Sequence, residues 1–321
     1  MLTTSFFVLI FAIQITAVPV TIPVSFVSSN YNWTQLGNFN NNGPGGPFPS
    51  GEMFSWLDAG IITPDQRDAF DLGMGCMVND AYFKVIGTEI EEVEPGHYVA
   101  GPYAVDIFLM TYDIRVHPDR TSTARAYIKL ENTQIGILNA DIFCGCNSGA
   151  DTDFAVVTSS DSDAIFETTD TWVYTGDQVA DPRVFYSFGD GSMPLFSTTT
   201  TVWNNAGTEG IGFSYAYSFS GPETIGIMFF VELYNNAEPA PDYLKFVDYG
   251  TLQGAGGNLI DDLVSSDIQI IKNWDISGIS LSSTPSTNPS SVLSNSPTET
   301  PTNSPTNSPT NSPTNSPTNS P

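Results

Sequence analysis

The C-terminal residues 282–321 restrict what this chain can fold into more than any other stretch. From Pro297 onward a proline returns at every fourth position, and the last five intervals between prolines all read Thr-Asn-Ser. Such a segment has almost nothing apolar to bury, so it cannot offset the conformational entropy that folding would cost. Because proline favours extended polyproline II, residues 282–321 are predicted to form a disordered spacer of about 120 Å at full extension. Serine and threonine beside proline are also typical of O-glycosylated stalks.

The N-terminal residues 1–17 predict a secretory signal peptide. They carry no charged side chain, and the apolar run Phe6–Ile13 lies a few residues before the small residue Ala17. The run is too short to span a bilayer, which needs about 20 apolar residues. It fits a signal peptide cleaved after Ala17, although its first residues lack Lys and Arg; the alternative is a buried N-terminal strand of an intracellular protein. The sequence therefore indicates an extracellular or cell-surface location.

No second apolar segment long enough to span a bilayer follows, so no membrane insertion is expected within these residues. Two alternatives stay open for the end of the natural chain. Either the protein is released, or its repeat continues to a lipid anchor or a membrane helix.

The region between the two ends, residues 18–281, is long enough for one large β-domain or two small sub-domains. The formal net charge of the chain is −26, because only 9 Lys and Arg residues accompany 35 Asp and Glu residues. A field of this sign repels nucleic acid and anionic lipid surfaces, so neither is an expected partner, whereas it attracts cations. With only two histidines, His97 and His117, a multi-histidine zinc or copper site is not expected.

The three cysteines of the chain predict one disulfide in an oxidising compartment. The bond joins Cys76 to either Cys144 or Cys146. Closing a loop of about 70 residues would stabilise the fold by about 4 kcal/mol. The remaining thiol is either buried and inert or open to an intermolecular bond.

Asn32-Trp33-Thr34 is the one sequence in the chain that fits an N-glycosylation acceptor. In a secreted protein Asn32 is therefore a candidate glycosylation site on an exposed loop. An unmodified loop asparagine is the alternative.

One short helix is predicted over Thr63–Gly73. Thr63 can cap it, Pro64 suits its first position, Gln66 completes a capping box, and Gly73 ends it.

The remainder of residues 18–281 reads as short strands separated by Gly, Pro and Asp turns. Val18–Val27 contains Pro19 and Pro23 and predicts an edge strand, whereas Glu223–Tyr234 is apolar on both faces and predicts a central one. The other predicted strands are Phe108–Val116, Ala124–Leu130, Ile135–Phe143, Phe154–Thr158, Thr171–Thr175, Val184–Phe188, Leu244–Tyr249 and Ile268–Ile271. Because no helices alternate with them, the predicted fold is all-β, an antiparallel, jelly-roll-like β-sandwich with one short helix.

Ile211–Phe219 alternates large apolar side chains with small residues. All its rings therefore share one face of a strand. Such a face is typical of sandwich core; an exposed platform on which sugars stack is the alternative.

An acidic stretch contains the candidate calcium ligands. The pairs Asp151/Asp153 and Asp161/Asp163 flank a predicted strand, and calcium prefers carboxylate oxygens. Aspartate is also a common turn former, so solvated turns without an ion are the alternative.

Glu89, Glu91 and Glu94 are the candidate catalytic residues. Retaining glycosidases need two carboxylates about 5 Å apart, and residues two apart on a strand share a face. The Glu-x-Glu-x-x-Glu spacing resembles the acidic strand of jelly-roll glucanases, whose middle residue is normally aspartate, so Glu91 departs from that pattern. Gly87 and Pro95-Gly96 bound the segment, as in a solvated edge hairpin, which is the alternative.

Together these features favour a secreted or cell-surface, non-enzymatic protein of structural, adhesive or ligand-binding type. No cofactor is expected other than calcium, and the candidate partners are extracellular glycans and matrix or cell-surface proteins. The alternative is a secreted carbohydrate-active enzyme or carbohydrate-binding module that uses the tail as a linker.

Overall fold

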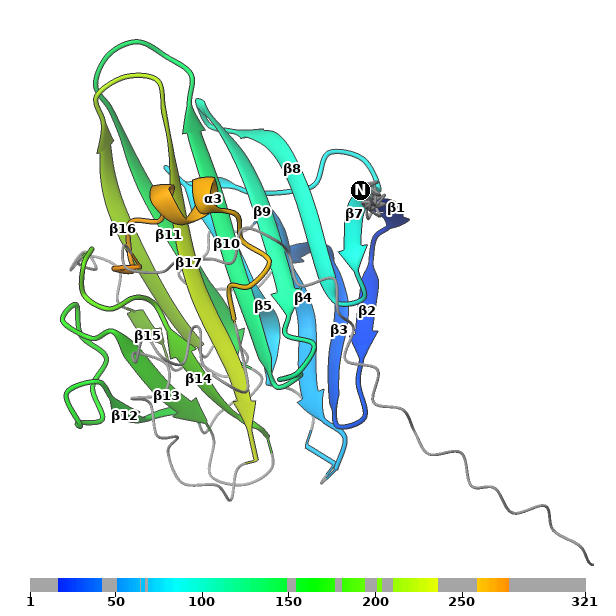
Figure 1. The fold of residues 1–321 in the computed structure, drawn as a ribbon. Coiled ribbons are helices and arrows are strands. Elements are labelled where there is room, and N and C mark those ends of the chain that lie inside the picture. The colour runs from blue at the N-terminus through cyan, green and yellow to red at the C-terminus, as the bar shows by residue number, and fades with distance from the viewer. Residues whose placement is uncertain are drawn as a thin grey trace, which may run out of the picture. The chain divides into compact units, whose positions relative to one another are not determined.

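The computed structural model describes most of the chain before the proline-rich tail. The described residues are 17–41, 51–63, 65–66, 69–148, 154–176, 181–193, 201–203, 210–235 and 259–276. They form two sheets that lie face to face (Figure 1), and every pairing between their strands is antiparallel. The predicted antiparallel β-sandwich is therefore confirmed. The tail residues Ser283–Pro321 form a separate unit outside the described residues.

The first sheet has nine strands. In spatial order they are β1 (Val18–Thr21), β7 (Glu89–Glu94), β8 (His97–Val105), β9 (Phe108–Val116), β10 (Thr123–Asn132), β17 (Glu223–Tyr234), β14 (Arg183–Ser187), β13 (Trp172–Gly176) and β12 (Ala155–Ser159).

The second sheet has eight strands. Seven follow one another as β15 (Thr201–Trp203), β16 (Gly210–Phe219), β11 (Leu138–Ser148), β5 (Phe70–Val78), β4 (Gly51–Ile61), β3 (Tyr31–Asn41) and β2 (Val24–Val27), and β6 (Ala81–Tyr82) pairs with β5.

The core lies between the sheets and is rich in aromatic side chains. Rings meet across the two layers at Phe54–Tyr112, Trp56–Tyr98 and Phe213–Phe229, all in the edge-to-face arrangement that aromatic pairs favour. The hydroxyl of Tyr112 also donates to the backbone oxygen of Met74 on the facing sheet. The core interpretation of Ile211–Phe219 is confirmed, since its first and last residues and the rings of Phe213 and Tyr215 are buried.

Several strand predictions are confirmed, with small shifts at their ends. The ranges Phe108–Val116 and Glu223–Tyr234 coincide with β9 and β17, and β17 is central, between β10 and β14. The edge stretch Val18–Val27 is two strands: β1 closes one edge of the first sheet, and β2 closes one edge of the second. The predicted strand at Ile135 starts only at Leu138, and Leu244–Tyr249 lies outside the described residues.

The helix predicted over Thr63–Gly73 is wrong. Ile61 and Gln66 exchange two backbone hydrogen bonds across a turn, and β5 begins at Phe70. Capping signals contribute only about 1 kcal/mol. Strand β5 lies between β4 and β11, and Phe70 and Met74 are buried in the core, which outweighs that local preference.

The strand predicted over Ile268–Ile271 is also wrong, because these residues belong to helix α3 (Ser265–Ile270) and its end. Ile268 and Ile271 are three residues apart and therefore share one face of the helical turn. Both are buried, packed on the outer face of the first sheet. None of the helices in the described part of the chain is long and apolar enough to cross a membrane.

Candidate functional site

Residues 259–276, which we call the strap, cross the outer face of the nine-stranded sheet (Figure 1). They are the last described residues before the tail. The strap contributes seven buried apolar side chains, which pack on a set of buried rings and Met228 from β10, β13, β14 and β17. The strap side chains are Leu259, Ile260, Leu263, Ile268, Ile271, Trp274 and Ile276, and the sheet side chains are Tyr127, Trp172, Tyr174, Phe185, Met228 and Phe230.

Beside this apolar contact the sheet presents three basic side chains in one row. His97 on β8 is the register partner of Arg115 on β9, which in turn is opposite Arg125 on β10. Residues in register on neighbouring strands point to the same face, so the three side chains gather on the outer surface. All three are buried, with exposed fractions of 5%, 5% and 2%. In a chain with so few basic residues, this is a marked concentration of basic side chains.

Carboxylates of the strap and of β9 neutralise this row. Asp262 accepts from both terminal nitrogens of Arg125, at 2.6 and 2.7 Å, and from Arg115 at 2.9 Å. Asp113 accepts from Arg125 at 3.1 Å and lies 3.1 Å from Nε2 of His97. We call His97, Asp113, Arg115, Arg125 and Asp262 the charged cluster.

Two further carboxylates border the charged cluster. Glu94, at the end of β7, accepts from Nε of Arg115 at 3.0 Å. Asp261 of the strap accepts from NH1 of the same guanidinium. Arg115 therefore joins the edge of the sheet to the strap.

Arg125 and Asp262 hold each other ionised. Burial by itself lowers the pKa of Arg125, but the Asp262 and Asp113 carboxylates outweigh burial and raise that pKa above its ordinary value. Burial raises the pKa of Asp262, but Arg125 and Arg115 outweigh it and hold the pKa well below its usual range. Arg125 and Asp262 each compensate the desolvation of the other, so removing one would leave the other as a buried charge with fewer partners.

The geometry of the cluster also permits a test for a metal centre. Ligand atoms of His97, Asp113 and Asp262 lie within 4.8 Å of one another, the one such group of three among the described residues. However, the two guanidiniums already donate to the oxygens that would bind a cation. A divalent ion would have to displace two buried positive charges, so these residues do not fit a metal centre. They fit an ionic clamp between the strap and the sheet.

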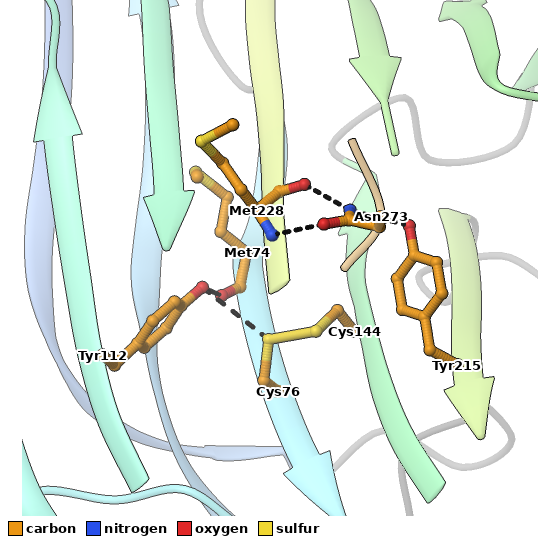
Figure 2. Close-up of a disulfide and its surroundings, with 7 residues drawn as sticks. All are labelled: Met74, Cys76, Tyr112, Cys144, Tyr215, Met228 and Asn273. Carbon is orange, nitrogen blue, oxygen red and sulfur yellow. Dashed lines mark hydrogen bonds between the residues drawn. A yellow bond between two sulfur atoms is a disulfide. The ribbon is translucent and has the colours of Figure 1, made fainter. Parts of the chain in front are cut away.

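A second anchor of the strap is the side chain of Asn273 (Figure 2). Strand β14 pairs only with residues 230–234 of β17, and the strap takes its place further along that strand. The amide of Asn273 accepts from the Met228 N–H at 3.0 Å and donates to the Met228 oxygen at 2.6 Å. It also donates to the Phe188 oxygen, and the neighbouring Trp274 donates to Met228 O at 2.7 Å. The Asn273 side chain thus makes the hydrogen bonds to Met228 that a neighbouring strand would otherwise make.

The sequence-predicted catalytic residues all lie on strand β7. Glu89 and Glu91 are exposed on β7, on either side of the buried Ile90, whereas Glu94 is held by Arg115. Strand β1 is the edge strand of this sheet and pairs with β7, so β7 is the second strand from the edge.

The candidate calcium ligands divide between described and undescribed parts of the chain. Asp151 and Asp153 lie outside the described residues. Asp161 and Asp163 both accept from the Ser159 hydroxyl, at 2.7 and 3.1 Å. The hydrogen bond from Ser159 is the main cause that lowers the pKa of Asp161. In the structure these two carboxylates organise a turn.

Cys76 is bonded to Cys144, which is its register partner in the pairing of β5 with β11 (Figure 2). Cys146 is free and buried, with its sulfur 2.8 Å from the Tyr186 hydroxyl. Burial raises the pKa of the Cys146 thiol to about 11, which leaves it protonated and inert at neutral pH.

Asn32 lies in strand β3 and not on the predicted exposed loop. Its neighbour Trp33 is fully buried and donates from Nε1 to the Thr121 backbone oxygen at 3.0 Å. The pairing of β3 with β2 and β4 holds the segment in the sheet. Period-two alternation then turns Asn32 to the outer face, where it is half-buried.

Sequence reasoning missed the charged cluster. The predicted strand Phe108–Val116 contains Asp113 and Arg115, but their partners Arg125 and Asp262 are 12 to 147 residues away in the chain. The available signal was the rarity of basic residues in the chain. That rarity points to Arg115 and Arg125 only when the register of β9 with β10 is known, because the register places both on one face of the sheet.

No protein-family model and no curated protein matches this sequence. Among solved structures, a galactose mutarotase-like protein from Lactobacillus casei is similar with a TM-score of 0.39 and 6% identity, over 66% of this chain and 99% of that one. A polysaccharide lyase has a TM-score of 0.33 and 9% identity, over 65% of this chain and 33% of the lyase. A TPR-domain containing protein from Parabacteroides distasonis has a TM-score of 0.38 and 7% identity, over 71% and 54%.

Proposed function

We propose that this chain is a secreted or cell-surface, non-enzymatic protein of structural, adhesive or ligand-binding type. In this proposal residues 18–281 form a β-sandwich head, and residues 282–321 form an O-glycosylated stalk that displays it. Extracellular glycans and matrix or cell-surface proteins are its candidate partners.

The observation that carries the proposal is the way the strap is fastened. The strap is the last described segment before the tail, and the charged cluster and Asn273 fix it to the sheet at two separate places. A stalk needs a firm attachment to its head, because a force on the stalk is transmitted to the head through the segment that joins them.

The use of the acid–base groups supports a non-enzymatic role. A catalytic histidine or carboxylate must reach the substrate atom it serves. His97 is 5% exposed, and Asp113 and Asp262 are committed to Arg125. These groups stabilise the fold by their mutual contacts.

Expression of the full chain in a eukaryotic secreting host tests the proposal. We expect the protein in the medium with Val18 as its first residue, and hexoses on Ser and Thr of residues 282–321 by mass spectrometry. Retention inside the cell with residues 1–17 intact would overturn the secreted location.

The same preparation tests the non-enzymatic role. Incubation with a panel of polysaccharides should release no reducing sugar and no unsaturated product. Turnover that is lost in Glu89→Gln or His97→Asn, with the Tm unchanged, would instead support the carbohydrate-active alternative.

A further inference from the structure

The side chain of Asn32 projects from the outer face of the eight-stranded sheet. In the pairing of β3 with β4, Trp33 is opposite Ala59, and both are fully buried in the core. The alternate pair, Asn32 opposite Gly60, therefore points away from the core. Gly60 has no side chain, so the space across the strand from Asn32 is open.

A turn folds back over this space and makes a cavity. After β4 ends, Ile61 and Gln66 exchange backbone hydrogen bonds of 2.6 and 2.9 Å, and Ile62 N–H donates to the Asn30 oxygen at 2.7 Å. The resulting cavity has a volume of about 390 Å³. Its lining includes Asn32, Thr34, Asp58, Gly60, Asp65 and Gln66.

We infer that Asn32 carries an N-linked glycan and that its first N-acetylhexosamine lies in this cavity. The inference rests on the secreted location proposed above. The acceptor sequence and the cavity are separate observations that meet at the same side chain. A half-buried asparagine can bear a sugar only where the fold leaves room beside it, and here the room begins at that asparagine.

The cavity lining suits a sugar. The carboxylates of Asp58 and Asp65, the amide of Gln66 and the hydroxyl of Thr34 make the lining polar, and Gln66 Nε2 already donates to Asn235. Ile62 adds an apolar patch for a ring face or the acetyl methyl group. The volume lies within the range of about 300–1,000 Å³ that is usual for small-molecule sites.

The modification itself is a group transfer from an oligosaccharide pyrophosphate donor of the secretory pathway. A bond forms between Asn32 Nδ2 and the anomeric carbon of the first sugar, and the bond from that carbon to the pyrophosphate oxygen breaks. The pyrophosphate leaves with the electron pair, and Nδ2 loses one proton. Because Asn32 is half-buried once β3 has paired, the transfer must precede the closing of the sheet.

Stepwise deglycosylation of the secreted protein tests the inference. An endoglycosidase that leaves one N-acetylhexosamine on Asn32 should not change the Tm. Complete removal should lower the Tm by about 2–4 °C, the shift expected for roughly 1 kcal/mol in a domain of this size. The amidase that cleaves the Asn32–sugar bond should act on unfolded protein and only slowly on native protein, since the bond lies in the cavity.

Matched variants separate the sugar from the side chains. Thr34→Ser keeps the acceptor sequence and should retain the glycan. Asn32→Gln should be secreted without the glycan and with a Tm lowered by about as much as complete removal lowers it. Because the amidase leaves aspartate at position 32, Asn32→Asp is the matched control for the fully stripped protein. If Asn32→Gln does not fold, the trimmed and stripped forms of the unaltered chain still give the comparison.

The outcomes are distinguishable. A secreted chain that starts at Val18 but has unmodified Asn32 would overturn the inference and leave the proposed function intact. A glycan whose complete removal changes neither the Tm nor the native amidase rate would overturn its placement in the cavity. A chain that is not secreted would overturn the proposed function and the inference with it.

Discussion

Asn273 shows how much of this fold depends on one polar side chain. It is fully buried, yet it satisfies the N–H and oxygen of Met228 and the oxygen of Phe188. A buried backbone group without a partner costs about 1–3 kcal/mol, so these bonds matter most when they are lost.

We therefore predict that Asn273→Ala lowers the free energy of unfolding by about 2–4 kcal/mol, because it leaves several buried backbone groups unpaired. Urea denaturation followed by tryptophan fluorescence measures the change. Asn40→Ala is the control, since Asn40 is exposed on β3 and its removal should cost less than about 0.5 kcal/mol. Equal effects of the two substitutions would show that the Asn273 amide is not an anchor.

The cysteines allow a prediction from thiol counting. With a pKa raised to about 11 by burial, Cys146 should not react with iodoacetamide at pH 8 in the native protein. One thiol should react in urea without reductant, and three should react in urea with reductant, because Cys76 and Cys144 are bonded. Cys146→Ala should abolish the single thiol; two or more reactive thiols in urea alone would refute the pairing.

At the scale of elements, the strap is fastened by two different kinds of interaction. Its apolar side chains pack on β10, β13, β14 and β17, while Asp262 reaches Arg115 and Arg125 on β9 and β10. Asp262 is 17% exposed and Arg125 is 2% exposed, so their ion pair is shielded from most solvent screening. Protonation of Asp262 at low pH should weaken this ion pair and so loosen the attachment of the strap.

We predict that Asp262→Asn lowers the free energy of unfolding at pH 7 by about 3–5 kcal/mol, since it removes the carboxylate that two buried guanidiniums share. The folded-state pKa of Asp262 is below its unfolded value. Its contribution is therefore fully present above pH of about 4 and is lost as the pH falls through the folded-state pKa. Thermal melts from pH 7 to pH 2 should show a flatter acid limb for the variant than for the unaltered chain.

Asp261→Asn is the matched control on the neighbouring residue. Asp261 also contacts Arg115, but its side chain is 40% exposed, so its loss should cost about 0–1 kcal/mol. If both substitutions cost the same and leave the acid limb unchanged, the charged cluster does not fasten the strap.

At the scale of the whole molecule, the strap and the tail should differ sharply in their effect on folding. A chain that ends at Ser282 should keep the Tm of the full protein within about 1 °C, because the tail offers no apolar surface to bury. A chain that ends at Asn235 should not fold, because it loses seven buried strap residues, each worth about 1.5–3 kcal/mol. The seven side chains together contribute about 10–20 kcal/mol, which equals or exceeds a typical domain stability of about 5–15 kcal/mol. Calorimetry of the two chains checks this, and an unchanged Tm in the shorter chain would contradict it.

Local patterns in the sequence were sufficient for the fold class and for several strands. Phe108–Val116 and Glu223–Tyr234 were predicted correctly because alternation and two-sided apolarity are written within each segment. Two of the errors, at Thr63–Gly73 and Ile268–Ile271, fall where local signals were weak and packing decided the conformation. Short segments of this kind adopt whichever structure buries their apolar side chains.

The candidate site depended on contacts that no local pattern contains. The sequence indicated a disulfide from Cys76 but left its partner open, and the register of β5 with β11 selected Cys144. The charged cluster requires three strands in register and a carboxylate 137 residues from Arg125. Side-chain periodicity acts over a few residues, so sequence alone was enough to predict several of the strands. Desolvation and ion pairing act between residues that are distant in the chain. Only the assembled sheets therefore decide how the strap contacts Arg115 and Arg125 and where the cavity beside Asn32 forms.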